Sequence, residues 1–204
     1  MLGKLGRTQT IKQDQKGLEV PPGQFLTEKF PVLTFGSAPK VDLETWQFKI
    51  SGLVEKEISL TWGEFMSLEK VTLDAEFHCV TQWSRLQNTW EGVSFNEVMK
   101  LLKLKPEAKY IMAHCYGGYS TNLALDVVTD DDVLFAYKHD GKLLSRDHGG
   151  PLRLVVPKRY AWKSAKWVNG LEFMAEDEPG FWEVRGYHMR GDPWKEERFQ
   201  GGLY

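Results

Sequence analysis

Residues 71–79 alternate between apolar and polar side chains, and this run constrains the fold of the chain more than any other feature. In an extended strand, successive side chains point to opposite faces of the sheet. The odd-numbered residues of the run, which ends with Cys79, are the apolar ones, so we expect a strand with one apolar face and the Cys79 thiol on that side. Residues 80–84 follow at once and predict a turn.

The position of Cys79 permits two interpretations. A thiolate at the end of a strand is a good ligand for a soft metal, or a nucleophile, whereas a buried thiol also serves as a small core residue. The chain has two cysteines in 204 residues. This number is too small for a disulfide framework and agrees with a reducing compartment, although one bridge stays possible.

The remaining patterns predict more strands than helices. Capping-box sequences begin short helices at Thr61 and Ser94. Strands are predicted at residues 46–50, 110–113, 151–157 and 166–173, and residues 133–144 predict a hairpin that turns at Asp140–Gly141. Strands and helices do not alternate regularly, so we expect a strand-rich α+β fold with mixed sheets. Residues 1–29 are expected to form an extended, partly disordered arm, and residues 30–204 a single domain.

The overall charge gives little indication of a charged partner. The formal net charge is -2 and the pI is near 6.2, so neither nucleic acid nor an anionic membrane is expected as a partner. Near Met1 there is no apolar leader segment, and no stretch approaches the roughly 18 apolar residues that span a bilayer. These observations predict a cytoplasmic protein without a membrane span.

Cationic side chains gather in residues 146–166. They are Arg146, His148, Arg153, Lys158, Arg159, Lys163 and Lys166. Arginine and lysine donors beside the exposed backbone N–H groups of Gly149 and Gly150 would form a cradle for a phosphate or another compact anion. The alternative is a solvated basic surface. The cradle is favoured because proline, tryptophan and glycine, rather than acidic residues, stand between the charges.

Two further patterns leave alternatives open. The dipeptides His78-Cys79 and His114-Cys115 contain a possible zinc ligand set. Neighbouring strand residues point to opposite faces, however, so each dipeptide supplies one ligand to a common point and the set is incomplete. The aromatic segment 180–194 is either an ordered tail over the core or one wall of a pocket, with Tyr187 and Arg185 as its polar groups.

Together, these motifs resemble those of the sulfite oxidase family of molybdopterin enzymes. The resemblance rests on Cys79, on Arg146-Asp-His-Gly-Gly-Pro-Leu-Arg-Leu-Val-Val-Pro157, on Trp162-Lys-Ser-Ala-Lys-Trp167 and on Arg185-Gly-Tyr187. The sequence Cys79-Val-Thr-Gln-Trp-Ser84 is most similar to the short, single-domain bacterial branch, which includes the protein-methionine-sulfoxide reductase catalytic subunit. The resemblance covers about residues 30 to 190, which is the molybdopterin domain alone.

The resemblance implies a role for each matching residue. Cys79 would bind the metal as the protein's thiolate ligand, and the catalytic set would be Cys79, Tyr187 and Arg85. The implied cofactor-binding residues are Thr34, Phe35, His114, Cys115, His148, Arg153, Ser164, Ala165 and Lys166. The implied cofactor is Mo-molybdopterin.

By the same resemblance, the chain is a molybdenum-molybdopterin oxidoreductase that transfers an oxygen atom, with a two-electron change, to or from a small sulfur or nitrogen oxide. Sulfite oxidases have Asn-Arg-Arg after the metal cysteine, whereas this chain has Gln82-Trp83-Ser84-Arg85. We therefore expect a substrate less charged than sulfite, and a separate electron donor or acceptor protein. The alternatives are a non-catalytic molybdopterin-binding or storage module and a zinc-binding module.

Overall fold

The structure of the protein is a computed structural model that describes residues 19–201. Residues 1–18 of the predicted arm lie outside the described residues. The rest of the arm contains strand β1 (Phe25–Leu26), which pairs in parallel with β6 (Trp83–Arg85). Backbone bonds from Phe25 N to Gln82 O (2.9 Å) and from Thr27 N to Ser84 O (2.9 Å) extend this pairing. The arm is therefore fastened to the domain beside the turn that follows Cys79.

Three sheets form the framework. The first has the order β1-β6-β5, with β5 (Phe77–His78) antiparallel to β6. The second has the order β11-β10-β7-β4, with β12 paired to β10, and consists of β4 (Val71–Asp74), β7 (Thr89–Ser94), β10 (Leu134–His139), β11 (Lys142–Leu143) and β12 (Arg153–Val155). The third has the order β3-β2-β13-β8-β9 and consists of β2 (Gln47–Gly52), β3 (Ile58–Thr61), β8 (Tyr110–Cys115), β9 (Ser120–Ala124) and β13 (Val168–Met174). Because β13 is parallel to β2 and antiparallel to β8, the third sheet is mixed, as predicted.

Helices within the described residues are few and short. They are α1 (Trp62–Ser67), α2 (Phe95–Met99) and α3 (Leu125–Val128). Single 3₁₀ turns occur at Tyr116–Gly118, Arg146–His148, Glu183–Arg185 and Pro193–Lys195. The predicted capping box is complete at Thr61, where the hydroxyl accepts from Glu64 N and the Glu64 carboxylate accepts from Thr61 N. At Ser94 only the first of these two bonds forms, since the Glu97 carboxylate binds Lys100 instead.

The predicted hairpin is present, with β10 and β11 antiparallel on either side of Asp140 and Gly141. Both turn residues have positive φ, 48° and 73°, as the commonest two-residue hairpin turn requires. The run 71–79 is correctly predicted to be extended, but it forms two strands, β4 and β5, which belong to different sheets. Between them, Ala75 N bonds to Asn88 O (3.0 Å), so the chain leaves one sheet and enters the next.

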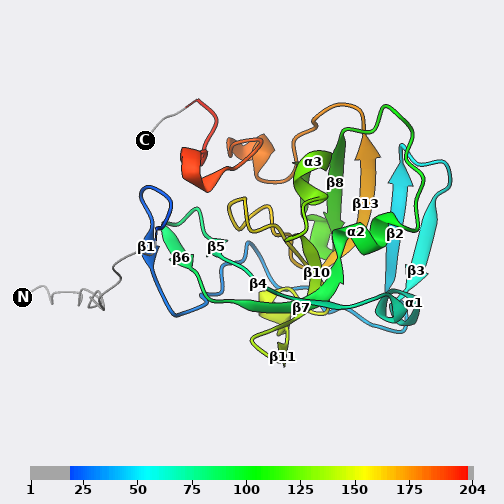
Figure 1. Cartoon of the computed structure of the whole chain (residues 1–204), viewed down its shortest axis with the longest axis horizontal. Coiled ribbons are helices and arrows are strands. Elements are labelled where there is room, and N and C mark those ends of the chain that lie inside the picture. Colours follow the sequence, from blue (N-terminus) through cyan, green and yellow to red (C-terminus); the bar gives the residue numbers. More distant parts are fainter. Residues whose placement is uncertain (1–18, 202–204) are drawn as a thin grey trace, which may run out of the picture.

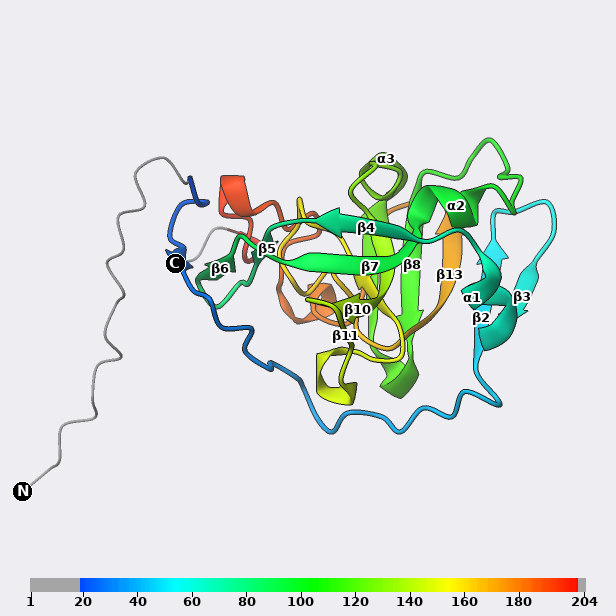
Figure 2. The ribbon, with the colours of Figure 1, turned by 60° about the horizontal axis from the view of Figure 1, so that its bottom comes forward.

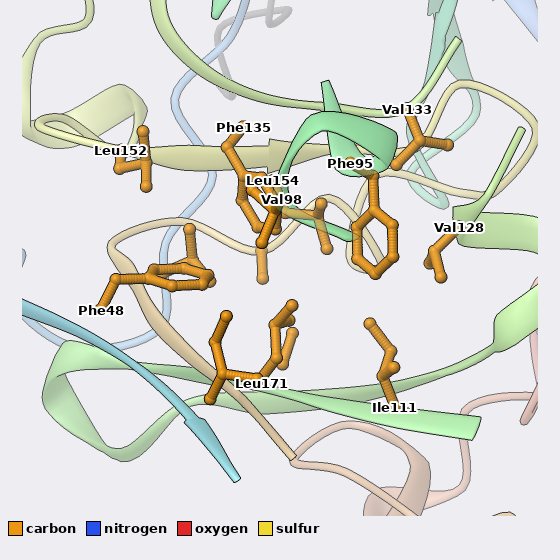
Figure 3. Close-up of a cluster of buried hydrophobic side chains, with 14 of the residues drawn as sticks. Phe48, Phe95, Val98, Ile111, Val128, Val133, Phe135, Leu152, Leu154 and Leu171 are labelled. Atoms are coloured by element: carbon orange, nitrogen blue, oxygen red, sulfur yellow. The ribbon is translucent and has the colours of Figure 1, made fainter. Parts of the chain in front are cut away.

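The main hydrophobic core lies between the second and third sheets. Phe48 from β2, Ile111 from β8 and Leu171 from β13 face Phe135 from β10 and Phe95 from α2 (Figure 3). All five side chains are buried. A second, smaller cluster contains Phe77, Cys79, Trp83 and Trp90. This smaller cluster brings the predicted apolar face of residues 71–79 against β10 and β12.

The three-stranded sheet lies at one end of the molecule and the third sheet at the other, with the second sheet between them (Figure 1). Residues 27–46 connect β1 to β2 along the outside of the domain (Figure 2). We call residues 30–39 of this connection the strap. Within the described part of the chain, every helix is too short or too polar to cross a membrane.

Candidate active site

A pocket of about 360 Å³ opens beneath the strap. Five segments line it: the strap itself, the turn that contains Cys79, the loop 116–119 after β8, the stretch from His148 to Trp167, and the aromatic segment that contains Tyr187. These segments are far apart in the sequence and are brought together by the β1–β6 pairing and by β12. The pocket is therefore a product of the tertiary fold.

Cys79 lies at one side of this pocket, directly after β5, with 5% of its surface exposed. Its backbone N–H donates to Trp83 O (2.8 Å), its carbonyl accepts from Gln82 N (3.1 Å), and its Sγ is 3.1 Å from the Thr81 hydroxyl. Gln82 has a φ of 72°, a conformation that costs energy for a side chain other than glycine. The predicted turn is thus a tight loop that holds the sulfur against the pocket.

Three basic residues line the pocket: His148, Arg153 and Lys166. Arg153 is 4% exposed, and its Nη1 donates to His148 O (3.0 Å). Lys166 Nζ donates to Leu33 O (2.8 Å), the Thr34 hydroxyl (2.8 Å) and Asp147 O (2.6 Å). None of these acceptors is a carboxylate, so the positive charges are not neutralised by their hydrogen-bond partners.

Burial and mutual repulsion perturb these cations. Burial, helped by Arg153, lowers the pKa of Lys166 to about 7. Burial first, and then the charges of Arg153 and Lys166, lower the pKa of His148 to about 4. Burial lowers the pKa of Arg153 to about 10, against an opposing effect of the Cys79 thiolate. Burial and repulsion disfavour the charged forms of these side chains, and a bound anion would offset both effects. The pocket therefore favours an anionic ligand.

Aromatic rings form the rest of the wall. Tyr187 lies against Trp182 (4.9 Å between ring centroids) and edge-on to Trp162 (5.1 Å). Phe35 of the strap packs on Phe181 (5.4 Å) and Trp182. Burial, and then the charge of the Cys79 thiolate, raise the pKa of Tyr187. The phenol therefore stays protonated near neutral pH and can donate a hydrogen bond.

The structure brings most of the predicted site residues to this one pocket. Those that line it are Thr34, Phe35, Cys79, His148, Arg153, Ser164, Ala165, Lys166 and Tyr187. Three others, Arg85, His114 and Cys115, are not among its lining residues.

Arg85 is engaged in a separate network on β6. Its guanidinium donates to Asp140 Oδ2 (2.6 Å), Asn88 Oδ1 (2.7 Å) and Glu28 O (3.1 Å), and its Nη1 lies 2.9 Å from His139 Nε2. With these partners it joins the arm to the β10–β11 hairpin rather than entering the pocket.

His114 and Cys115 end β8 with their side chains on opposite faces, as the strand prediction requires. His114 is exposed and pairs with Glu172 (3.0 Å). Cys115 is 7% exposed within the main core, and burial raises its pKa. The residues that follow, Tyr116 and Gly117, do line the pocket, so this loop reaches the site one position later than predicted.

One expectation about the cradle is wrong. The N–H groups of Gly149 and Gly150 donate within the chain, to Arg146 O (3.1 Å) and Ser145 O (3.0 Å), and are not free for an anion. A Cβ on Gly149 would lie 3.0 Å from Lys166, and one on Gly150 2.2 Å from Leu144 O. These glycines let the backbone pack closely against Lys166 and Leu144. Donors for an anion are therefore side chains and not these backbone N–H groups.

The cationic stretch also divides into two groups. Lys158 pairs with Asp130 (2.7 Å), and Lys163 pairs with Glu183 (2.7 Å). These acidic partners come from distant parts of the sequence, so the local scarcity of acidic residues did not indicate them. The charges left for the pocket are those of Arg153 and Lys166, with His148 beside them as a neutral imidazole near pH 7.

Phe30 is a pocket residue that the sequence motifs did not include, and Trp162 lines the pocket too, although the motif that contains it was given no role for this residue. Phe30 lies between the rings of His139 and His148, 4.5 Å from each, and its carbonyl accepts from His148 Nε2 (3.0 Å). The one signal for Phe30 was its place in an apolar segment after the polar arm.

The composition of the pocket fits an anionic, sulfur-containing cofactor. None of the described residues that line the pocket is an aspartate or a glutamate. The buried Nε of Arg153 has no hydrogen-bond partner, although buried polar atoms are normally paired. A pocket that contains arginine and lysine donors, a thiol and no carboxylate suits a ligand that carries a phosphate and a soft metal.

Comparison with known proteins places this pocket in a family. Residues 35–182 match the model of the oxidoreductase molybdopterin binding domain. The oxidoreductase YuiH of Bacillus subtilis, itself uncharacterized, is 44% identical over 191 residues, which are 93% of this chain and 96% of YuiH. The sulfite oxidase of Arabidopsis thaliana is 28% identical, over 76% of this chain and 48% of that protein. A provisionally named protein-methionine-sulfoxide reductase subunit of Azospira oryzae, YedZ1, is 27% identical, over 83% of this chain and 66% of that protein.

Among solved structures, the sulfane dehydrogenase SoxCD from Paracoccus pantotrophus has the same fold, with a TM-score of 0.64 and 23% identity over 73% of this chain and 42% of that one.

The family match and the relatives together define the class of this protein. It is an enzyme, an oxidoreductase that binds molybdopterin. More narrowly, the chain belongs to the oxidoreductase molybdopterin binding domain family, with a fold of the sulfite oxidase type. It spans about half the length of the sulfite oxidase it matches.

Proposed function

We propose that this enzyme transfers an oxygen atom, with a two-electron change at molybdenum, to or from a small neutral sulfur or nitrogen oxide. The observation that carries the proposal is the Cys79 thiol, which lies in the same pocket as Arg153, Lys166 and Tyr187. A thiolate charge on Cys79 influences the pKa values of all three. All four side chains line the same pocket, so they can contact one bound molecule.

In this proposal, each residue has one task. The Cys79 sulfur binds the metal, which keeps the thiol deprotonated. His148, Arg153 and Lys166 hold the phosphate and the pterin edges of the cofactor, and the strap, through Thr34 and Phe35, covers it. When bound, the cofactor supplies the two-electron redox chemistry of the reaction. Tyr187 donates a hydrogen bond to the oxygen of the substrate.

The preference for a neutral substrate follows from where the cations are. His148, Arg153 and Lys166 are assigned to the cofactor, and Arg85 is held by Asp140 and Asn88. The described residues around the Cys79 side then offer aromatic rings and a tyrosine hydroxyl rather than a second guanidinium. An oxyanion such as sulfite would be desolvated there without a paired charge, which costs several kcal/mol. A sulfoxide or an N-oxide avoids this cost, and the name of the Azospira relative agrees with a sulfoxide.

A separate protein has to supply or accept the electrons. Among residues 19–201 there are two free cysteines, and no group of three or more His, Cys, Asp or Glu side chains could hold a metal ion. The described residues thus form no second metal centre of this kind. We infer that a partner protein exchanges electrons with the cofactor at the pocket.

Replacing each buried cysteine in turn tests the proposal. Both thiols are buried, so Cys115→Ser is a matched control for Cys79→Ser. We expect Cys79→Ser to lower kcat/KM by about a hundredfold or more, because a direct metal ligand is lost, while most of the pterin is retained. Cys115→Ser should keep both activity and molybdenum. Molybdenum analysis, release of the oxidised fluorescent pterin and dye-linked turnover measure these effects.

The assay panel contains sulfoxides, N-oxides and sulfite, with reduced or oxidised dye as the electron source or acceptor. We expect higher kcat/KM values for the neutral oxides than for sulfite. Equal molybdenum content and equal, measurable activity of wild type and Cys79→Ser would contradict the role of Cys79 as the metal ligand. A wild type that binds the cofactor but acts on none of the compounds would favour a storage module. A clearly higher kcat/KM for sulfite than for the neutral oxides would contradict the proposed preference for a neutral substrate, but not the proposed oxygen-atom transfer.

A further inference from the structure

A fully buried ion pair lies immediately behind the aromatic wall of the pocket. Lys163 Nζ is 2.7 Å from Glu183 Oε1, and both side chains are 0% exposed. Neither residue lines the pocket. Moving two charges out of water is costly, and a buried pair is weak evidence for added stability. What this pair contacts is therefore more informative than the pair itself.

Glu183 Oε1 is the shared acceptor of a network. It accepts hydrogen bonds from the indole Nε1 of Trp162 (2.8 Å) and from the hydroxyl of Thr121 (3.1 Å) in β9. Lys163 Nζ donates in addition to the backbone oxygen (2.8 Å) and the side-chain oxygen (2.7 Å) of Asn122. The network joins β9, the segment that carries Trp162, and the C-terminal segment that carries Tyr187.

Close packing brings these segments together at Gly180. A Cβ at this position would lie 2.6 Å from Thr121 Cα and 2.8 Å from Glu183 Oε2. Backbone bonding from Phe181 N to Ser120 O (2.9 Å) fixes the register of the C-terminal segment on β9. The carboxylate of Glu183 is thus held in one place, and its hydrogen bond to Trp162 has a defined direction.

Trp162 connects Glu183 to the pocket, because its ring contacts Tyr187. Its ring stacks on Tyr160 (5.4 Å, 16° between planes) and meets Tyr187 edge-on (5.1 Å, 85°). The backbone oxygen of Trp162 accepts from the Tyr119 hydroxyl (2.5 Å). Since Tyr187 lies between Trp162 and Trp182, the orientation of the Trp162 indole limits the orientation of the Tyr187 ring.

We propose that Glu183 is a positioning residue: it fixes the Trp162 indole through a charge-assisted hydrogen bond and thereby sets the orientation of the Tyr187 hydroxyl in the pocket. Lys163 compensates the buried charge of the carboxylate. Hydrogen bonds to an ionised acceptor are shorter and stronger than neutral ones, which suits the task of fixing a large ring. The expected effect on kcat rests on the proposed function of Tyr187. The expected effect on the orientation of the Tyr187 ring does not.

The geometric test uses protein, as purified, that carries 3-fluorotyrosine. The chain has seven tyrosines, and the ¹⁹F resonance of residue 187 is the one that disappears in Tyr187→Phe. We expect this resonance to shift in Glu183→Gln, which weakens the bond to Trp162, and in Trp162→Phe, which removes the indole donor but keeps the ion pair. Glu178→Gln, at an exposed acidic residue five positions before Glu183, is the matched control and should leave it in place.

The kinetic test is a double-mutant cycle. Trp162→Phe should lower kcat about five- to tenfold with little change in KM, and in the Tyr187→Phe background it should lower kcat by less than about twofold. If Trp162 had a purely structural role, the fold-changes in kcat caused by Trp162→Phe and Tyr187→Phe would multiply in the double variant. If Glu183→Gln does not fold, Trp162→Phe decides alone, because it leaves Lys163 and Glu183 paired.

The inference is overturned if the ¹⁹F resonance of residue 187 does not shift in folded Trp162→Phe. It is also overturned if the fold-changes in kcat caused by Trp162→Phe and Tyr187→Phe multiply in the double variant. If the wild type turns over no oxide at all, the proposed function fails, but the ¹⁹F measurement still decides whether Glu183 and Trp162 orient Tyr187.

Discussion

At the scale of single residues, Lys166 has an unusual environment for a lysine. It donates to two backbone oxygens and one hydroxyl but has no carboxylate partner, and Arg153 is close by. The pKa of Lys166 is lowered to about 7, first by burial and then by Arg153. The lysine is therefore protonated below about pH 7 and loses its charge as the pH rises through that value. The energetic penalty of the buried charge is present in full below about pH 7 and decreases gradually as the pH rises from there toward the ordinary pKa of lysine.

This titration predicts a pH dependence of anion binding. Sulfate is a suitable probe because it stays doubly charged throughout the range. In protein made without the cofactor, sulfate affinity should fall severalfold between pH 6 and pH 8, because one unit of charge in the pocket is lost. His148, with a pKa of about 4, and Arg153, with a pKa of about 10, do not titrate in this range. Calorimetric titration with sulfate at each pH measures the affinity.

Lys166→Arg is the matched variant for this experiment, since arginine keeps its charge across the whole range. Its sulfate affinity should change by less than about twofold between pH 6 and pH 8. A wild type whose affinity is flat over this interval, or a variant that follows the wild type, would show that Lys166 is not the titrating group.

At the scale of elements, two exposed glycines with open space around them should respond oppositely to the same substitution. Neither a Cβ on Gly141 nor one on Gly63 would meet an atom within 4 Å. Gly141 has a φ of 73° in the β10–β11 turn, whereas Gly63 lies within helix α1. The difference between them is therefore one of backbone conformation alone.

Gly141→Ala should lower the free energy of unfolding by about 1 kcal/mol, because a side chain is strained at positive φ. Gly63→Ala should raise it by up to about 1 kcal/mol, because alanine restricts the unfolded chain and favours the helix. Urea denaturation of both variants and the wild type gives the two differences. If both substitutions changed stability in the same direction, the hairpin turn would not have the backbone described here.

At the scale of the whole molecule, the strap covers one side of the pocket. His148 binds the carbonyl of Phe30, and Lys166 binds residues 33 and 34. The Phe30 ring also contacts Phe77 (5.3 Å) and Trp90 (5.8 Å) of the smaller cluster. The cations assigned to the cofactor thus also hold the segment that covers it.

Phe30→Ala should therefore destabilise the whole domain, by about 2–3 kcal/mol, through lost aromatic packing. Phe35→Ala is the control, because Phe35 is 68% exposed, and it should cost less than about 1 kcal/mol. Urea unfolding followed by tryptophan fluorescence measures both values. Two variants of equal stability, or a separate early transition in the wild type, would mean that the strap does not unfold together with the domain.

Local signals predicted individual elements well. The Asp140–Gly141 turn, the capped start of α1 at Thr61 and the strand before Cys115 are present because each depends on neighbours in the sequence. The same reasoning did not anticipate that residues 71–79 divide between two sheets, since that break is set by pairing with Asn88. The cytoplasmic location and the electron-exchange partner remain predictions.

By itself, the sequence determined the family, the strand-rich class of fold and most of the residues that line the pocket, because these follow from motif spacing and side-chain periodicity. Tertiary structure decided which charges are available there. Lys158 and Lys163 are paired by carboxylates from distant positions, Arg85 is bound to the hairpin, and the charges of Arg153 and Lys166 are left for the pocket. The physical reason is that the effect of a charge depends on its partners in space and on its distance from water, and the order of residues along the chain specifies neither directly.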